Sequence, residues 1–262
     1  MNPIAISVSS IEIRWYAIFI LCAFLLGMYL VKKESKRLGI NLEIIMNLCF
    51  YLVIVSIIGA RIYYVLFEFE QYKDNLIDIF KIWNGGLAIH GGIIAGITFS
   101  YFYCRKYKLN YLKITDIIAP ALIIGQAIGR WGNFFNSEAF GPITTLSTLK
   151  SLHIPKFIID GMYINVHGIY HYYHPTFLYE SLWCLIGFVI IMFIRKNKKI
   201  KIGQISATYF IIYGIERFFV ESLRQDSLML FNIKVAQLVS IIMIISGIIL
   251  WIYTIKNSNN YN

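Results

Sequence analysis

The chain has 262 residues, of which 58% are hydrophobic and only 15% are charged, and its mean hydropathy is +0.64. This composition excludes an ordinary soluble globular domain and indicates a polytopic membrane protein. A formal net charge of +10 could suggest a nucleic-acid partner. However, the basic residues concentrate in alternate loops between apolar stretches, so we expect no nucleic-acid binding.

Seven apolar stretches are long enough to cross about 30 Å of hydrocarbon as helices. We therefore expect an all-α polytopic membrane protein with seven transmembrane helices. The chain is expected to form a single integral membrane domain over residues 1–262, within which residues 136–175 make a small extracytoplasmic loop region with a short hairpin. The predicted spans are residues 12–31, 44–67, 86–104, 115–135, 176–194, 203–220 and 235–255.

The distribution of lysine and arginine predicts the orientation of these spans. Basic residues cluster at 32–37, 105–113 and 195–201 and recur at Lys256 near the C-terminus. By the positive-inside rule these loops face the cytoplasm, which places the N-terminus outside and the C-terminus inside. This arrangement agrees with an odd number of spans.

Two polar residues stand out in the first two spans. Tyr16 follows Arg14 and Trp15 at the predicted outer interface, where aromatic residues commonly anchor a helix. Arg61 lies within the second span and needs a polar partner there. The polar segment that follows, residues 68–82, is predicted to form a short helix lying on the outer face.

The third span begins with the sequence WNGGLAIHGG. His90 is followed by two glycines, so its imidazole is presented beside bare backbone near the outer surface. A single histidine is commonly structural. The neighbouring glycines leave room for a ligand, so a catalytic role is the alternative.

The stretch GQAIGRWGNFFNSEAFG, residues 125–141, closes the fourth span and carries unusual polarity for its depth. On a helix, Arg130 and Asn133 project to the same side, and a guanidinium beside an amide, walled by aromatic residues, suits a phosphate or carboxylate. The alternative is an interfacial helix end whose arginine extends to the water. Small-residue spacing in the same stretch would allow close approach of another helix or a ligand; the residues are Gly125, Gly129 and Gly132.

The loop after this stretch contains MYINVHGIYHYYHP, which predicts a hairpin turning near His167 and Gly168. His171 and His174 have no nearby carboxylate or cysteine to complete a metal site, so no metal is expected. Glu180 then lies near the outer end of the fifth span, where it needs a partner.

The sixth span ends in YGIERFFVESLRQD. On a helix, Arg217, Glu221 and Arg224 would share one face, either as an exposed ion-pair ladder or as part of a site. Arg217 lies within the apolar run, so it should point to a pocket or a polar partner.

The predicted topology brings many polar residues to one depth. Two arginines from different helices, facing an outer cavity, describe a site for an anionic group, and an anionic phospholipid is the most available ligand there. The residues at this depth are Tyr16, His90, Arg130, Asn133, Glu138, Glu180, Arg217, Glu221 and Arg224.

The segment GRWGNFFNSEAFG resembles the signature of the bacterial phosphatidylglycerol:prolipoprotein diacylglyceryl transferase family. Other segments agree in order along nearly the whole chain, and the departures, Ala17 and Phe135, are small. The matching segments are RWYA, GARIYYVLF, GGLAIHGG, HPTFLYES, YGIERFFVESLRQDS and VAQLVS.

The resemblance implies an enzyme of the bacterial cytoplasmic (inner) membrane that uses no cofactor and acts towards the outer face. Its substrates would be phosphatidylglycerol and a preprolipoprotein signal peptide with a lipobox cysteine. The diacylglyceryl group would pass to the cysteine thiol as a thioether, with release of glycerol 1-phosphate.

For this reaction we assign Arg130 and Arg217 to the phosphate, because bidentate guanidiniums fit its oxygens. His90 is the candidate general base for the thiol, since imidazole ordinarily titrates near neutrality; alternatively, the arginines alone activate the thiol. The remaining expected binding residues orient the arginines or the head group; they are Tyr16, Asn133, Glu138, Gly141, Glu221 and Arg224.

Two rival functions follow from the same residues. One is a transporter or channel for an organic anion; against it, the polar residues gather at one depth and no span is expected to carry charge towards its inner half. The other is a different lipid-modifying transferase, such as a glycerophosphate acyltransferase, which would bind phosphate by the same means.

Overall fold

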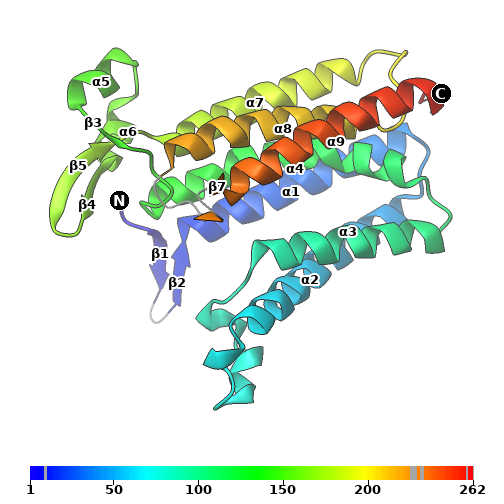
Figure 1. Cartoon of the computed structure of the whole chain (residues 1–262). Helices are drawn as coiled ribbons and strands as arrows, with labels where there is room; N and C mark the ends of the chain where they lie inside the picture. Colours follow the sequence, from blue (N-terminus) through cyan, green and yellow to red (C-terminus); the bar gives the residue numbers. More distant parts are fainter. Residues whose placement is uncertain (9–10, 225–228, 231–232, 258, 262) are drawn as a thin grey trace. The chain divides into compact units, whose positions relative to one another are not determined.

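The computed structural model describes residues 1–8, 11–224, 229–230, 233–257 and 259–261. The chain divides into two compact units, Met1–Leu30 with Thr115–Asn262, and Val31–Ile114. The long helices (Figure 1) are α1 (Trp15–Arg37), α2 (Leu42–Phe67), α3 (Ile89–Lys106), α4 (Tyr111–Phe135), α7 (Thr176–Ile194), α8 (Gln204–Leu223) and α9 (Val235–Asn257).

Five of the described helices, α1, α2, α4, α7 and α9, are long and apolar enough to cross a membrane. The prediction was an all-α polytopic membrane protein with seven spans; the structure is mostly helical and agrees with a polytopic membrane protein, and it also contains short β-strands. The helices α3 and α8 coincide with the other two predicted spans but are more polar. Whereas α3 ends in Arg105 and Lys106, α8 carries Glu216, Arg217 and Glu221 within its apolar run.

The first helix begins three residues later than predicted, because the preceding residues form a hairpin. Strands β1 (Ile4–Val8) and β2 (Ile11–Arg14) pair in antiparallel fashion. The region expected to be a short helix is also different. Residues 68–82 form short 3-10 turns, η1 (Phe69–Gln71), η2 (Leu76–Phe80) and η3 (Ile82–Asn84), rather than one α-helix.

A small sheet lies between α4 and α7 in the sequence. Its strand order is β3-β5-β4, with β3 at Ile143–Thr144, β4 at Tyr163–Val166 and β5 at Ile169–Tyr173. Strands β4 and β5 make the expected hairpin, with its turn at His167 and Gly168, both of which have positive φ. Two short helices precede it, α5 (Leu146–Ser151) and α6 (Lys156–Gly161).

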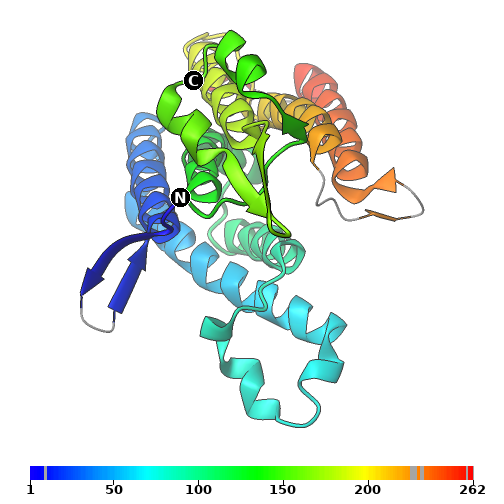
Figure 2. The ribbon, with the colours of Figure 1, turned by 90° about the vertical axis from the view of Figure 1, so that its left-hand side faces the viewer.

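These elements lie at one end of the helices of the same unit, where α4 ends and α7 begins (Figures 1 and 2). Buried side chains join them to the helices: Leu149 of α5, Ile158 of α6 and Tyr173 of β5 belong to one apolar cluster with Phe134 and Phe177. The C-terminal end of α4 and the N-terminal end of α7 are therefore held together by packing as well as by the chain that connects them. The remaining short strands, β6 (Met229–Leu230) and β7 (Ile233–Lys234), pair just before α9.

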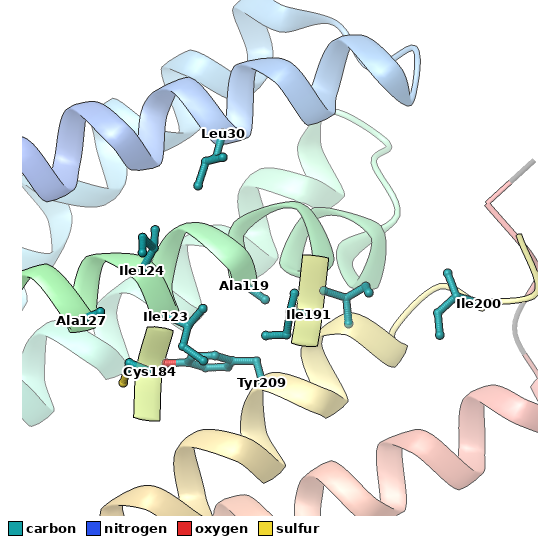
Figure 3. Packing of buried hydrophobic residues seen from close by; sticks show 10 residues of the cluster. Leu30, Ala119, Ile123, Ile124, Ala127, Cys184, Ile191, Ile200 and Tyr209 are labelled. Atoms are coloured by element: carbon teal, nitrogen blue, oxygen red, sulfur yellow. The ribbon is translucent and has the colours of Figure 1, made fainter. Parts of the chain in front are cut away.

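A second apolar cluster fills the space between α4, α7 and α8 (Figure 3). Ile123 and Ile191 are fully buried there, and Tyr209 points its hydroxyl towards Cys184 (Figure 3). Two helix backbones can approach each other closely only where the residues between them are small. A methyl group added at Gly214 or Gly247 would fall within 3.0 Å of the facing helix backbone, because α8 and α9 are in close contact.

Asp116 is a buried carboxylate near the start of α4. In the predicted topology this end of the span faces the cytoplasm, so the expectation that no span carries charge towards its inner half overlooked Asp116. The carboxylate accepts hydrogen bonds from the backbone N–H groups of Gly203, at 2.5 Å, and Ser206, at 2.7 Å, and from the Tyr261 hydroxyl. The two N–H donors lie at the N-terminus of α8, where a helix has unsatisfied N–H groups and favours negative charge. Asp116 thus has a structural role that requires no path across the membrane.

In the unit Val31–Ile114, α2 and α3 pack through facing glycines. A methyl group at Gly59 would lie 2.8 Å from the carbonyl oxygen of Gly91, and one at Gly91 would lie 2.3 Å from that of Gly59. Asn41 caps the start of α2, since its side-chain oxygen accepts a hydrogen bond from the N–H of Glu43 at 2.9 Å.

The partner that Arg61 requires is the backbone of the segment following α2. Its guanidinium donates to the carbonyl oxygens of Ile79 and Asp78 at 2.7 Å, of Gly85 at 2.8 Å and of Gly86 at 2.9 Å. It also lies over the ring of Tyr72, 5.0 Å from its centroid. Arg61 is only 7% exposed, so one buried side chain organises the whole segment between α2 and α3.

We expect Arg61→Leu to release this segment, because four backbone carbonyl groups lose a charged donor. Amide hydrogen exchange between residues 69 and 88 should accelerate by about tenfold or more, while exchange within α2 and α3 stays slow. Arg105→Leu is the matched control, as Arg105 is exposed and contacts only the Tyr101 ring at 5.9 Å among its described contacts. Equal exchange in the Arg61→Leu variant and the wild type would contradict the assignment.

Candidate active site

The centre of the site is an ion pair between Arg130, near the end of α4, and Glu180, near the start of α7. Nη2 of Arg130 lies 2.6 Å from Oε2 of Glu180. The glutamate side chain is completely buried, whereas the arginine side chain is 19% exposed. The guanidinium can therefore be reached from outside while its countercharge lies beneath it.

Arg217, on α8, reaches the same carboxylate. Its Nη1 lies 3.7 Å from Oε2 of Glu180, and its Nη2 lies 2.6 Å from Oε2 of Glu221 one turn later. The structure thus brings together the two arginines that the sequence assigned to a phosphate. The contact expected between Arg217 and Glu221 is present as well.

Glu216 is a further acid in this cluster, and the sequence interpretation missed it. The residue precedes Arg217 on α8 and is 2% exposed. It interacts electrostatically with Glu180, Arg130 and Arg217. The signal that could have revealed it was available, since a glutamate within an apolar helix requires a polar environment.

The cluster contains more acidic than basic side chains, so it is not simply a cationic pocket. Three buried glutamates, Glu180, Glu216 and Glu221, accompany two arginines. An anion that binds here must compete with the carboxylates for the two guanidiniums, which now lie in ion pairs with Glu180 and Glu221. Because guanidinium has five N–H donors, each arginine can keep one carboxylate contact and still donate to a phosphate.

The aromatic residues next to Arg130 in the sequence pack α4 against α7. The Trp131 indole donates to Oγ of Ser181 at 3.2 Å, and the same hydroxyl donates to the carbonyl oxygen of Ala127 at 2.9 Å. Phe134 stacks on Phe177, with ring centroids 4.6 Å apart. These contacts join α4 to α7 beside the Arg130–Glu180 ion pair and fix its geometry.

Tyr16 lies against the glycine-rich face of α4. A methyl group at Gly132 would be 2.5 Å from the Tyr16 ring, so only glycine allows this approach. One and two turns earlier, Gly129 and Gly125 face Ile20 and Ala23 of α1. The small-residue spacing is therefore used for packing α1 on α4. Tyr16 of α1 faces Gly132, which lies two residues after Arg130 on α4.

Asn133 lies in the last turn of α4, and Glu138 and Gly141 follow that helix. The Asn133 side chain donates to Oε1 of Glu138 at 2.8 Å, and Asn136 donates to the same oxygen at 3.3 Å. Gly141 donates its N–H to the carbonyl oxygen of His174 at 2.9 Å and packs so closely that a methyl group there would lie 2.9 Å from His174 Cβ. Within the described part of the chain, Arg130 is oriented by Glu180 rather than by this group.

Arg224 does not continue the helical face of Arg217 and Glu221, contrary to the sequence prediction. Helix α8 ends at Leu223, and Arg224 has an extended backbone with φ −79° and ψ 139°. Its carbonyl oxygen accepts a hydrogen bond from Nζ of Lys234 at 2.7 Å, as does that of Glu221. The Lys234 ammonium stabilises the C-terminus of α8, because the last carbonyl groups of a helix lack intrahelical partners and carry partial negative charge.

His90 lies in the first turn of α3, in the unit Val31–Ile114, and is exposed. Its ring centroid is 6.2 Å from that of Tyr63. His174 belongs to the other unit and contacts the Tyr179 hydroxyl through Nδ1 at 3.0 Å. Among the residues that the structure describes, no group of three His, Cys, Asp or Glu side chains is placed to hold a metal ion.

Comparison with known proteins gives a consistent result over nearly the whole chain. The family model described as "Prolipoprotein diacylglyceryl transferase" matches residues 3–253. A phosphatidylglycerol–prolipoprotein diacylglyceryl transferase of Staphylococcus carnosus is 46% identical, over 97% of this chain and 90% of the relative. Proteins with the same name from Listeria innocua and Staphylococcus xylosus are 45% and 46% identical, over 97% and 96% of this chain and 90% and 89% of theirs. The chain therefore belongs to the prolipoprotein diacylglyceryl transferase family.

Proposed function

We propose that this protein transfers the diacylglyceryl group of phosphatidylglycerol to the lipobox cysteine thiol of a preprolipoprotein. The observation that carries the proposal is the position of Arg130 and Arg217, whose guanidinium nitrogens lie 2.6 and 3.7 Å from one carboxylate oxygen of Glu180. Two guanidiniums this close, both partly exposed, can bind the oxygens of one phosphate group. Membership of the family supplies the reaction for which such a site is suited.

The reaction is a displacement at the glycerol carbon that bears the phosphate ester. The thiolate sulfur forms a bond to that carbon, and the carbon–oxygen bond to phosphate breaks. The electron pair of that bond stays on the phosphate, which leaves as glycerol 1-phosphate with one more negative charge. Arg130 and Arg217 stabilise this growing charge, which is where preorganised donors contribute most to a rate.

The other residues have supporting roles in this proposal. Glu221 holds Arg217, and Glu180 sets the distance between the two guanidiniums, as their ion pairs support. The remaining head-group contacts are proposed for residues on the neighbouring elements, namely Tyr16, Asn133, Glu138, Gly141 and Arg224. His90 is proposed as the base that takes the thiol proton.

We place the whole chain in the bacterial cytoplasmic membrane as one membrane domain. All seven long helices, including α3 and α8, are proposed to cross it, with the N-terminus outside. Residues 136–175 then lie on the outer side together with the ends of α4 and α7, where both phosphatidylglycerol and a secreted lipoprotein precursor can reach the arginines.

Mass spectrometry of a lipobox peptide incubated with the purified protein and phosphatidylglycerol tests the function directly. The peptide should gain the mass of one diacylglyceryl group on its cysteine, and glycerol 1-phosphate should appear in equal amount. An unchanged peptide would refute the proposal. Uptake of an organic anion into sealed vesicles without peptide modification would favour a transporter, and a different water-soluble product would favour another transferase.

His90→Gln is expected to slow transfer by about 100-fold at neutral pH, because a positioned base typically contributes at least this much. The rate should recover as the pH rises, since higher pH supplies thiolate without a base. The pH–rate profile with a lipobox peptide measures this. His153→Gln, which changes an exposed histidine outside the site, serves as the control. A small loss that is independent of pH would give His90 a structural role.

A further inference from the structure

Glu216 is a buried acid for which the described residues supply no hydrogen-bond donor. Its side chain is 2% exposed, and neither carboxylate oxygen has a hydrogen-bond partner in the described part of the chain. Burying such a group is costly unless it is paired, so a fold retains it when a ligand or a reaction uses it.

The two arginines beside Glu216 already have other carboxylate partners. Arg130 contacts Glu180, and Arg217 contacts Glu180 and Glu221. Glu216 interacts with both arginines and with Glu180 electrostatically, but no ion pair within 4.0 Å joins it to a described arginine. Its acceptor oxygens therefore remain at the site, next to the donors that would bind phosphate.

A phosphatidylglycerol head group combines two kinds of polar group. Its phosphodiester only accepts hydrogen bonds, which the guanidiniums can donate, while its terminal glycerol carries two hydroxyl donors. We propose that Glu216 accepts hydrogen bonds from these hydroxyl groups and thereby selects a lipid whose phosphodiester bears a polyol. This inference rests on the proposed function and names the residue that recognises the alcohol part of the substrate.

Glu138, an acid expected from the sequence to orient the arginines or the head group, is less suited to this task. It is exposed, and its Oε1 already accepts hydrogen bonds from Asn133 and Asn136. A buried acceptor discriminates more strongly than an exposed one, because water cannot replace the missing hydroxyl of a wrong ligand.

The test compares three lipids that share the same phosphodiester charge and acyl chains. Phosphatidylglycerol has two head-group hydroxyls, phosphatidyl-1,2-propanediol has one and phosphatidylethanol has none. Transfer to a lipobox peptide should fall in this order, and kcat/KM of the wild type for phosphatidylglycerol should exceed that for phosphatidylethanol by about tenfold or more. Absence of transfer from all three lipids would refute the proposed function itself, whereas equal transfer would overturn only the role of Glu216.

Two substitutions then assign the selectivity to this residue. Glu216→Leu should bring the ratio of kcat/KM values close to one, and Glu216→Gln, which keeps one acceptor oxygen, should give an intermediate ratio. Both variants should unfold in detergent at a temperature no lower than the wild type, because they remove a buried unpaired carboxylate. Wild-type selectivity in the folded variants, or failure of both to fold, would overturn the proposal.

Gln126→Leu provides the matched control. Oε1 of Gln126 is also buried without a hydrogen-bond partner among the described residues, and its Nε2 donates to the Tyr209 hydroxyl at 3.0 Å. This variant should retain the head-group selectivity of the wild type. A loss of selectivity here equal to that of Glu216→Leu would show a general packing effect and overturn the proposal.

Discussion

Arg130→Lys is expected to reduce diacylglyceryl transfer by about 100-fold or more, although the substitution keeps the positive charge. In the structure, one nitrogen of the Arg130 guanidinium contacts Glu180 at 2.6 Å, which leaves other N–H groups for the substrate. A lysine ammonium has one nitrogen. It cannot keep the contact with the Glu180 carboxylate and also donate two parallel hydrogen bonds to phosphate oxygens, as a planar guanidinium can. Initial rates of peptide modification, with kcat and KM determined separately, measure the effect.

The loss should appear chiefly in kcat, because the charge on the phosphate grows only as the carbon–oxygen bond breaks. Arg14→Lys is the matched control: Arg14 is exposed, ends β2 and lies outside the cluster, so its rate should equal that of the wild type. Near-normal transfer by Arg130→Lys would show that bidentate hydrogen bonding is not required at this position, and it would contradict the assignment of Arg130 to the phosphate.

Glu180→Leu is expected to have the second large effect, on stability as well as on rate. The carboxylate is completely buried and contacts both Arg130 and Arg217, so its removal leaves two largely buried guanidiniums without their shared countercharge. Loss of one partner of a buried ion pair commonly costs about 3–5 kcal/mol. The free energy of unfolding in detergent should fall by about this amount, and transfer should be lost because the two guanidiniums repel one another.

Glu138→Leu is the control for this experiment, since Glu138 is exposed and should contribute little to the free energy of unfolding. Comparison with Glu216→Leu is more informative still. Both substitutions replace a buried glutamate of one cluster by leucine, yet only Glu180 lies in an ion pair, so the two variants should differ in the sign of their effect. Equal destabilisation by both would show that burial alone, rather than pairing, determines the contribution.

Much of the helical arrangement could be predicted because it depends on local composition. The apolar stretches coincide with the long helices to within a few residues at most ends, and the turn at His167 and Gly168 lies where the dipeptide suggested it. Departures occur where polar and apolar residues alternate or where a side chain acts at a distance. Residues 11–14 form a strand rather than the start of a helix. The segment after α2 turns its backbone carbonyl groups towards the Arg61 guanidinium and so does not form one continuous helix.

The candidate site could be predicted only in part. The arginines were recognisable because a charge within an apolar helix demands a partner. The identity of the partner was not, since Glu180 lies 50 residues after Arg130 and on another helix. The assignment of Asn133 and Glu138 to Arg130 followed sequence proximity, whereas the structure directs their hydrogen bonds to each other.

By itself the sequence determined that the chain is a membrane protein of a recognisable family, which residues are too polar for their depth, and which helices carry them. These features depend on residue type and spacing, which can be taken directly from the sequence and compared with a known family. Only the tertiary structure decided that Arg130 and Arg217 share one oxygen of Glu180 and that Glu216 joins them without a hydrogen-bond partner among the described residues. Such pairings are set by how α4, α7 and α8 pack, and the energy of a buried charge depends on its neighbours in space rather than along the chain.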